Sequence, residues 1–177
     1  MTEEPRYAKF WDRFGAYILD ALIVGLISYG INYLNFISLK SFYIYLPIAL
    51  IAILYKPYME SRHQATLGKM ALNLKVTNLN YEQIDFEKSL LRSLIVMIPA
   101  LFFIPVQYLA FYNPNLLAIE GFWNFSKGVA ETYPTMRTFN SIYSLVFIAD
   151  LIFLLTDSSK RNRSLKDRIA KTLVLQK

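Results

Sequence analysis

An apolar run at residues 13–34, RFGAYILDALIVGLISYGINYL, constrains this chain more than any other feature. A helix rises about 1.5 Å per residue and a bilayer core is about 30 Å thick, so about 20 apolar residues cross it. The run is therefore long enough to span a membrane. It opens with Arg13 and carries Asp20 seven residues later, close to two helical turns, so both side chains leave the same helix face.

Asp20 would then lie about 10 Å inside the bilayer, where an aspartate costs about 2.5–3.5 kcal/mol on insertion scales. Such a residue normally faces protein or water, and two interpretations are open. In the first, Asp20 is an ion or proton site. In the second, it is a hydrogen-bond acceptor that holds helices together and never titrates.

Three further apolar runs follow, at residues 42–59, 93–112 and 139–156. With the first, taken as 14–34, they predict four transmembrane helices in a single domain covering residues 1–177. The chain is 55% hydrophobic, which is too apolar for a soluble domain of this length. We expect an all-α polytopic membrane protein.

Proline residues interrupt two of these runs. Pro47 is expected to kink the second span and Pro57 to help end it, with the Lys56 side chain reaching to the interface. Pro99 and Pro105 lie in the third span, where the backbone carbonyls that they free must find partners. A broken helix at a binding site and a plain kink are both open, and the kink is the more frequent case.

Two short segments alternate apolar and polar residues, LNLKVTN at residues 72–78 and KTLVLQK at residues 171–177. This period of two is typical of half-buried strands. We expect them to pair into a small ribbon at the membrane surface, leaning on something apolar because two strands alone are marginal.

Aromatic and apolar residues also flank the spans and favour contacts with the membrane interface. A short interfacial helix is predicted just before the first span, within residues 2–12, from the spacing of Tyr7, Phe10, Trp11 and Phe14. An interfacial anchor is predicted in the long loop at residues 113–138, from Leu116, Leu117, Ile119, Phe122, Trp123 and Phe125.

The distribution of Lys and Arg predicts the orientation. Sixteen of these residues lie before the first span, between the second and third, or after the fourth, against three in the other two connections. Because cytoplasmic segments carry the excess of basic residues, both termini are expected in the cytoplasm. The net charge of +6 then reflects topology, and no nucleic-acid partner is expected.

This topology places pairs of charged residues at equal depth. Asp20 and Asp150 each lie about 10 Å from the cytoplasmic face, where two neighbouring carboxylates could share a proton or bind a cation. Arg13 and Asp157 are level at the interface and could form an ion pair. Both expectations require the first and fourth helices to be neighbours.

Four segments in this order resemble the RDD family of bacterial membrane proteins: RFGAYILDALIV, TLGKMALNLKVTN at residues 66–78, Arg92 at the head of the third span, and LKDRIAKTLV. The family is named for one arginine and two aspartates, which fall here on Arg13, Asp20 and Asp167. Nearly the whole chain is covered. The family often has glycine or histidine before its last aspartate, whereas this chain has Leu-Lys there, and its loop at residues 113–138 is long.

The resemblance implies a protein of the bacterial inner membrane that transports ions or small ligands and has no catalytic mechanism. The residues agree, because a single histidine, His63, allows no HExxH zinc pair, and no cysteine is present. TLGK at residues 66–69 lacks the earlier glycine and the length of a phosphate-binding loop. No cofactor and no metal site are expected. Within TLGK, Thr66, Gly68 and Lys69 are interpreted as a turn or helix start whose surface cation meets a lipid headgroup or Asp167.

The predicted function is a small transporter or antiporter in the lipid bilayer. Asp20, together with Asp150, would bind a proton or monovalent cation, and Arg13 would set the pKa of Asp20. Four helices are few for an alternating-access pathway, so we expect a homo-oligomer or a complex with another membrane protein. The alternative is a membrane adaptor or regulator that binds another integral protein and transports nothing.

One further prediction concerns Asp167, which the topology places outside the bilayer. Ser164 would cap a short helix beginning at Leu165, with Asp167 in its first turn near the positive end of the helix dipole. We expect Asp167 to hold the tail against the turn at residues 66–69, closing the cytoplasmic mouth below Arg13.

Overall fold

The computed structural model describes residues 5–177. Four helices in it are long and apolar enough to cross a membrane. They are α1 (Phe10–Leu34), which the π-helical η1 (Asn35–Leu39) continues, α2 (Phe42–His63), α4 (Phe86–Phe111) and α7 (Thr135–Leu155). The predicted class, a helical membrane protein with four spans and a two-strand ribbon, is confirmed. Residues 2–4 of the predicted interfacial segment lie outside the described part of the chain.

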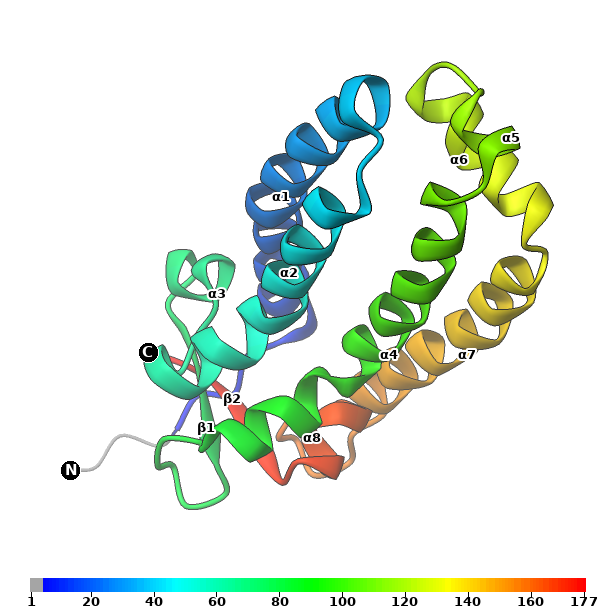
Figure 1. The fold of residues 1–177 in the computed structure, drawn as a ribbon. Helices are drawn as coiled ribbons and strands as arrows, with labels where there is room; N and C mark the ends of the chain where they lie inside the picture. The colour runs from blue at the N-terminus through cyan, green and yellow to red at the C-terminus, as the bar shows by residue number, and fades with distance from the viewer. Residues whose placement is uncertain (1–4) are drawn as a thin grey trace.

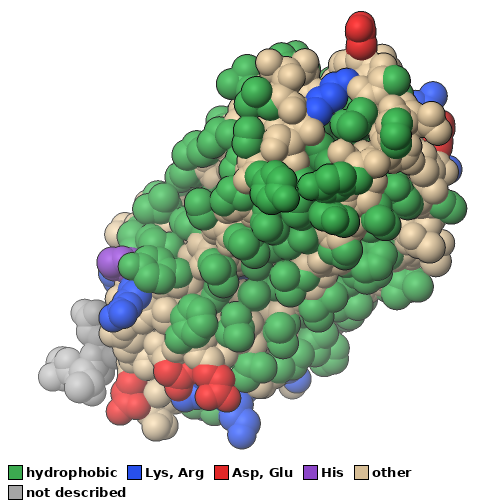
Figure 2. Space-filling model, in the orientation of Figure 1, with side chains coloured by type: hydrophobic (Ala, Val, Ile, Leu, Met, Phe, Trp, Pro, Cys, Tyr) green, Lys and Arg blue, Asp and Glu red, His purple; other side chains and the backbone are tan. Residues whose placement is uncertain are grey.

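The shorter elements gather at the two ends of this bundle. They are α3 (Leu67–Ala71), β1 (Leu74–Asn78), α5 (Pro114–Leu117), α6 (Phe122–Thr132), α8 (Leu165–Ile169) and β2 (Thr172–Gln176). Figure 1 shows α3, α8, both strands and the C-terminus at one end, called here the ribbon end, and α5 and α6 at the other, called the loop end. Apolar side chains cover most of the middle of the face in Figure 2, and charged side chains lie toward the two ends, as expected for a surface facing lipid.

All four long helices begin or end further out than predicted, and α7 begins at Thr135 instead of residue 139. Helix α1 begins at Phe10, so three of the aromatic residues assigned to a separate interfacial helix, Phe10, Trp11 and Phe14, lie in its first turns. Helix α2 runs through Pro57 to His63, and the prediction that Pro57 helps to end it was wrong. Helix α4 begins at Phe86, because the Asp85 side chain caps it by accepting a hydrogen bond from the Lys88 N–H (2.7 Å).

The internal prolines do not break the helices. Helix α4 is continuous through Pro99 and Pro105, so the broken-helix alternative for the third span is excluded. Helix α2 is likewise continuous through Pro47. Each proline removes one backbone donor, but the helical bonds on either side of it persist. Helix α4 also packs along α2, where the Ser89 hydroxyl donates to the Pro57 carbonyl (2.9 Å).

The predicted ribbon is confirmed. Strands β1 and β2 pair antiparallel, with Val76 opposite Val174. Tyr7 adds an isolated bridge to Leu175, and the Ala8 N–H donates to the Val174 carbonyl (3.0 Å), so the segment before α1 joins the ribbon instead of forming a helix. The apolar side chains of the ribbon are buried in a cluster, which supplies the support that two strands need: Ala8, Ala16, Leu74, Val76, Ile84 and Val174.

The loop end has its own aromatic core, and the predicted interfacial anchor is mostly part of it. Leu116 and Phe125 are buried against Phe36 and Phe111, so they face protein and not lipid. Trp123 is 74% exposed and is the residue of this set that remains available to an interface. This cluster therefore folds α5 and α6 onto η1 and the end of α4.

Candidate functional site

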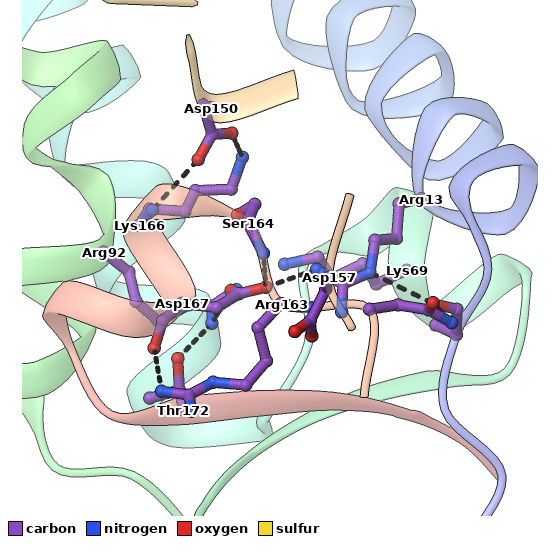
Figure 3. A network of polar contacts seen from close by, with 12 residues as sticks. Arg13, Lys69, Arg92, Asp150, Asp157, Arg163, Ser164, Lys166, Asp167 and Thr172 are labelled. Carbon is purple, nitrogen blue, oxygen red and sulfur yellow. Dashed lines mark hydrogen bonds and ion pairs between the residues drawn. The ribbon is translucent and has the colours of Figure 1, made fainter. Parts of the chain in front are cut away.

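A chain of buried ion pairs ties the helices together at the ribbon end. The Arg92 Nη1 donates to Asp167 Oδ1 (2.6 Å) and its Nε donates to Glu60 Oε2 (2.8 Å). Arg13 pairs with the other oxygen of Asp167, and Lys69 pairs with Glu60. Figure 3 shows Asp167 between Arg92 and Arg13. The side chains of Asp167 and Glu60 are fully buried, so these pairs hold α1, α2, α3, α4 and α8 in one arrangement.

The surroundings of Asp167 keep it ionised. Burial by itself raises the pKa of this carboxyl, but the guanidinium groups of Arg13 and Arg92 outweigh burial and hold the pKa well below its ordinary value. Asp167 also accepts the Ser164 N–H (3.1 Å). Ser164 is the N-cap of α8, which begins at Leu165 as predicted. Burial lowers the pKa of Lys69, and Glu60 offsets that only in part.

Asp20 is bound by three donors, all of them uncharged. Its Oδ1 accepts from the Tyr55 hydroxyl (2.9 Å) and the Gly68 N–H (2.8 Å), and its Oδ2 accepts from the Thr66 hydroxyl (2.5 Å). The Tyr55 hydroxyl in turn accepts the Leu67 N–H (2.9 Å). Asp20 therefore fastens the first turn of α3 to the middle of α1 and α2.

Gly68 is required by this close approach. A Cβ at position 68 would lie 2.1 Å from the Ala16 carbonyl oxygen and 2.9 Å from the Asp20 nitrogen, both backbone atoms of α1. Any side chain would force α3 away from α1 and lengthen the bonds to Asp20. The TLGK segment is thus a helix start, as interpreted, with Thr66 and Gly68 supplying donors to a carboxylate.

The remaining carboxylates of the sequence-predicted site have other partners. Asp150 accepts from the Lys166 Nζ (2.6 Å) and from the Lys166 N–H (2.9 Å). Asp157 accepts from the Arg163 N–H (2.8 Å) and from Arg168 (3.1 Å). Burial raises the pKa of Asp157, but these donors together with Ser159 lower it overall.

Several predicted pairings are corrected by these contacts. Arg13 pairs with Asp167, not Asp157, because α8 turns back under the bundle and reaches α1. Asp20 and Asp150 are held by different partners and no hydrogen bond joins them, although both are near the ribbon end as predicted. Arg13 lines the same cavity as Asp20, but its ion pair is with Asp167, and the hydrogen bonds to Asp20 come from uncharged donors.

The turn at residues 66–69 is also held differently from the prediction. Its donors bind Asp20 and not Asp167, and the tail is fixed by Arg13 and Arg92 instead. Lys69 is not a surface cation, since its side chain is 12% exposed and its partner is Glu60.

Two cavities lie between α1, α2 and α4. The ribbon-end cavity has a volume of about 360 Å³, and its wall includes Asp20, Thr66 and the cations of the ion-pair chain. The loop-end cavity has a volume of about 390 Å³ and lies further along the same three helices. The two share Ala52, Lys56 and Val96 as wall residues. Arg13, Asp20, Thr66, Lys69 and Arg92 thus meet at one cavity, whereas Asp150, Asp157 and Asp167 do not line it.

The loop-end cavity contains polar atoms without partners. Among the described residues, Asn32 Oδ1 and Gln107 Oε1 are buried and accept no hydrogen bond, and both side chains line this cavity. Ser28 and Ser93 add hydroxyl groups to the wall. Buried polar groups are nearly always satisfied, so such atoms need a water molecule or a ligand.

Sequence reasoning missed Glu60, and it treated Lys56 only as a residue at the end of a span. Both lie on α2, four residues apart and hence on one helix face. That spacing inside an apolar helix was a usable signal, but ending the span near Pro57 placed Glu60 in a loop. Across residues 5–177 no cluster of three His, Cys, Asp or Glu side chains could hold a metal ion.

The fold and the site define a multi-pass membrane protein whose helices are joined by a buried ion-pair chain beside an intramembrane carboxylate. The sequence model of the RDD family matches residues 7–171, so the chain belongs to the RDD family. The resemblance found in the sequence is confirmed. No match was found among curated proteins or among solved structures.

Proposed function

We propose that this RDD protein is a small transporter or antiporter that moves an ion or small ligand through the two cavities, with Asp20 as the proton- or cation-binding carboxylate. The observation that carries the proposal is the position of the cavities. They follow each other between the same three helices and share three wall residues. A protein that only holds a partner needs no such series of cavities inside its own bundle.

One stripe of each helix lines both cavities. On α1 it passes from Asp20 through Val24 and Ser28 to Asn32, at steps of four residues. On α4 it passes from Arg92 toward Gln107. Steps of three and four residues keep side chains on one helix face. The stripe therefore extends from the ribbon end toward the loop end, with polar side chains at both ends and apolar ones between them.

Asp20 is suited to couple this path to a proton because all three of its partners donate. An ionised carboxylate accepts three such bonds, whereas a protonated one presents an O–H donor where an acceptor is needed. Protonation would weaken the attachment of Thr66 and Gly68 and loosen α3, which forms part of the ribbon-end wall. Proton binding and the position of α3 are thereby linked.

The topology and assembly proposed from the sequence are retained. The excess of Lys and Arg in three segments favours a cytoplasmic ribbon end in the bacterial inner membrane. Because four helices are few for alternating access, we include a homo-oligomer in the proposal. The role of Asp150 as a second ion site stays a prediction, and its ion pair with Lys166 gives it a structural role as well.

Proton flux in proteoliposomes tests the proposal. Wild-type protein should move protons when a gradient of Na⁺, K⁺, Li⁺ or a small organic ion is imposed, and Asp20→Asn should abolish the flux. The matched control is Asp85→Asn, since Asp85 is exposed and asparagine caps a helix equally well. Flux unchanged in Asp20→Asn would exclude the role of this carboxylate.

The adaptor alternative predicts a different result. Absence of flux from the wild type, with a stoichiometric membrane protein recovered on mild-detergent purification, would favour it. Deleting the tail is a poor test of such an adaptor, because residues 158–177 contain Asp167 and strand β2, on which the fold depends.

A further inference from the structure

We propose that the ribbon-end cavity binds a small organic anion, with Lys56 receiving its charged head group and the apolar wall holding its body. The inference rests on the proposed transport function, because it names the class of ligand that this cavity would carry. It starts from the charges around the cavity.

The cavity wall is predominantly cationic. Five cations and one carboxylate line it, namely Arg13, Lys56, Lys69, Arg92, Lys166 and Asp20. Three further carboxylates, Glu60, Asp150 and Asp167, pair with four of the cations from behind the wall. With Lys56 charged, the group retains one positive charge when Asp20 is ionised and two when Asp20 is protonated. A monoanion would therefore neutralise a buried charge that is costly to leave uncompensated.

Lys56 is the cation without a partner. Among residues 5–177, no hydrogen bond and no ion pair reaches its Nζ, whereas the other four cations each contact a carboxylate. It lies where the two cavities adjoin, since it lines both. A lysine that lines a cavity without a carboxylate partner matches a carboxylate or phosphate head group.

The rest of the wall favours an apolar body on the ligand. Ala21, Val24, Val96 and Leu154 line the ribbon-end cavity, and no acidic side chain other than Asp20 does. An organic cation would meet a wall that retains a net positive charge, whereas Asp20, whose oxygens accept three hydrogen bonds, is left as the proton-binding carboxylate. The charge balance thus favours an anion.

Probes of one shape and different charge test this inference in purified wild-type protein. Benzoate, phenyl phosphate, neutral benzamide and benzylammonium would be titrated while the melting temperature is followed. We expect saturable stabilisation by benzoate or phenyl phosphate and none by benzamide or benzylammonium. The more effective anion assigns the head group as carboxylate or phosphate.

Lys56→Met is the decisive variant, because methionine keeps an unbranched apolar chain and removes the charge. It should weaken anion binding about tenfold or more, as expected when a charged hydrogen bond is lost. The matched control is Lys127→Met on α6, whose lysine is 76% exposed, and it should bind as the wild type does. Because Lys56 has no partner to lose, the variant should fold.

Equal stabilisation of wild type and Lys56→Met, or a response to benzylammonium and not to the anions, would overturn the inference. Its failure is distinguishable from failure of the transport proposal. If proton flux is seen but anion binding does not depend on Lys56, only the anion inference is rejected. If anion binding depends on Lys56 but no flux is seen, the transport proposal is rejected and the anion-binding site stands.

Discussion

Neutralising Asp167 should destabilise the protein strongly, because this carboxylate lies between two buried guanidinium groups. In Asp167→Asn, Arg92 keeps Glu60 as a partner, but Arg13 loses its only ion pair within residues 5–177. Breaking a buried pair by removing one member costs about 3–5 kcal/mol. For a chain of this size 1 kcal/mol corresponds to about 2–4 °C, so the melting temperature should fall by about 6–20 °C.

The dependence on pH follows from the same contacts. Arg13 and Arg92 hold the folded-state pKa of Asp167 below its unfolded value of about 3.9. Such a group contributes stability that is present above the unfolded pKa and is lost as pH falls through it toward the folded pKa. The wild type should therefore lose stability below about pH 4 more steeply than Asp167→Asn does.

Thermal unfolding in detergent, followed by tryptophan fluorescence, measures both effects. Asp85→Asn, at an exposed cap, is the matched control and should melt as the wild type does. Adding Arg13→Met to Asp167→Asn removes the uncompensated charge and should recover part of the loss, with a coupling of about 0.5–3 kcal/mol. A melting temperature for Asp167→Asn within about 2 °C of the wild type would refute the reasoning.

Two smaller perturbations test the attachment of α3. Gly68→Ala should destabilise by about 1–3 kcal/mol, because its Cβ meets the backbone of α1, whereas Gly25→Ala has open space and should be neutral in the same melting assay. Tyr55→Phe removes the donor to Asp20 and the acceptor for Leu67, and a loss of about 1–3 kcal/mol is expected. A wild-type melting curve for either variant would show that α3 is not held in this way.

Local patterns predicted much of this fold. The four apolar runs and the two alternating strands were found because helices and strands have their own periods, 3.6 and 2. The start of α8 at Leu165 followed from a serine cap, which is also a local signal. The end of α2 was wrong because Pro57 was read as a stop, although a proline inside a packed helix can be tolerated.

The pairings of the site were less predictable. Counting residues from the membrane edge gives the depth of Asp20 and Asp150, but depth does not tell which helix face meets which neighbour. Arg13 pairs with Asp167, which lies 154 residues later in the chain. The pairing of β2 with β1 places α8, just before β2, close to the start of α1. Such a contact depends on tertiary packing and has no local signal. Glu60 was missed for a different reason, the misplaced end of its helix.

Water access to single cysteines tests the central claim, that the two cavities form a water-accessible path inside the bundle. The chain contains no cysteine, so each variant carries one thiol. Two test variants place the thiol in a cavity: Ala52→Cys where the two cavities adjoin, and Ser28→Cys in the loop-end cavity. Two controls on the same helices place it on the outer surface: Ile51→Cys, next to Ala52, and Leu26→Cys, two residues from Ser28. The native side chains at these control positions are 70% and 66% exposed.

A small water-soluble methanethiosulfonate reagent reacts with thiolates, which form in water and not in lipid. In proteoliposomes we predict fast modification at positions 52 and 28 and slow modification at positions 51 and 26. An excess of benzoate should slow the reaction at position 52. Equal rates at the cavity and lipid-facing positions would contradict the account.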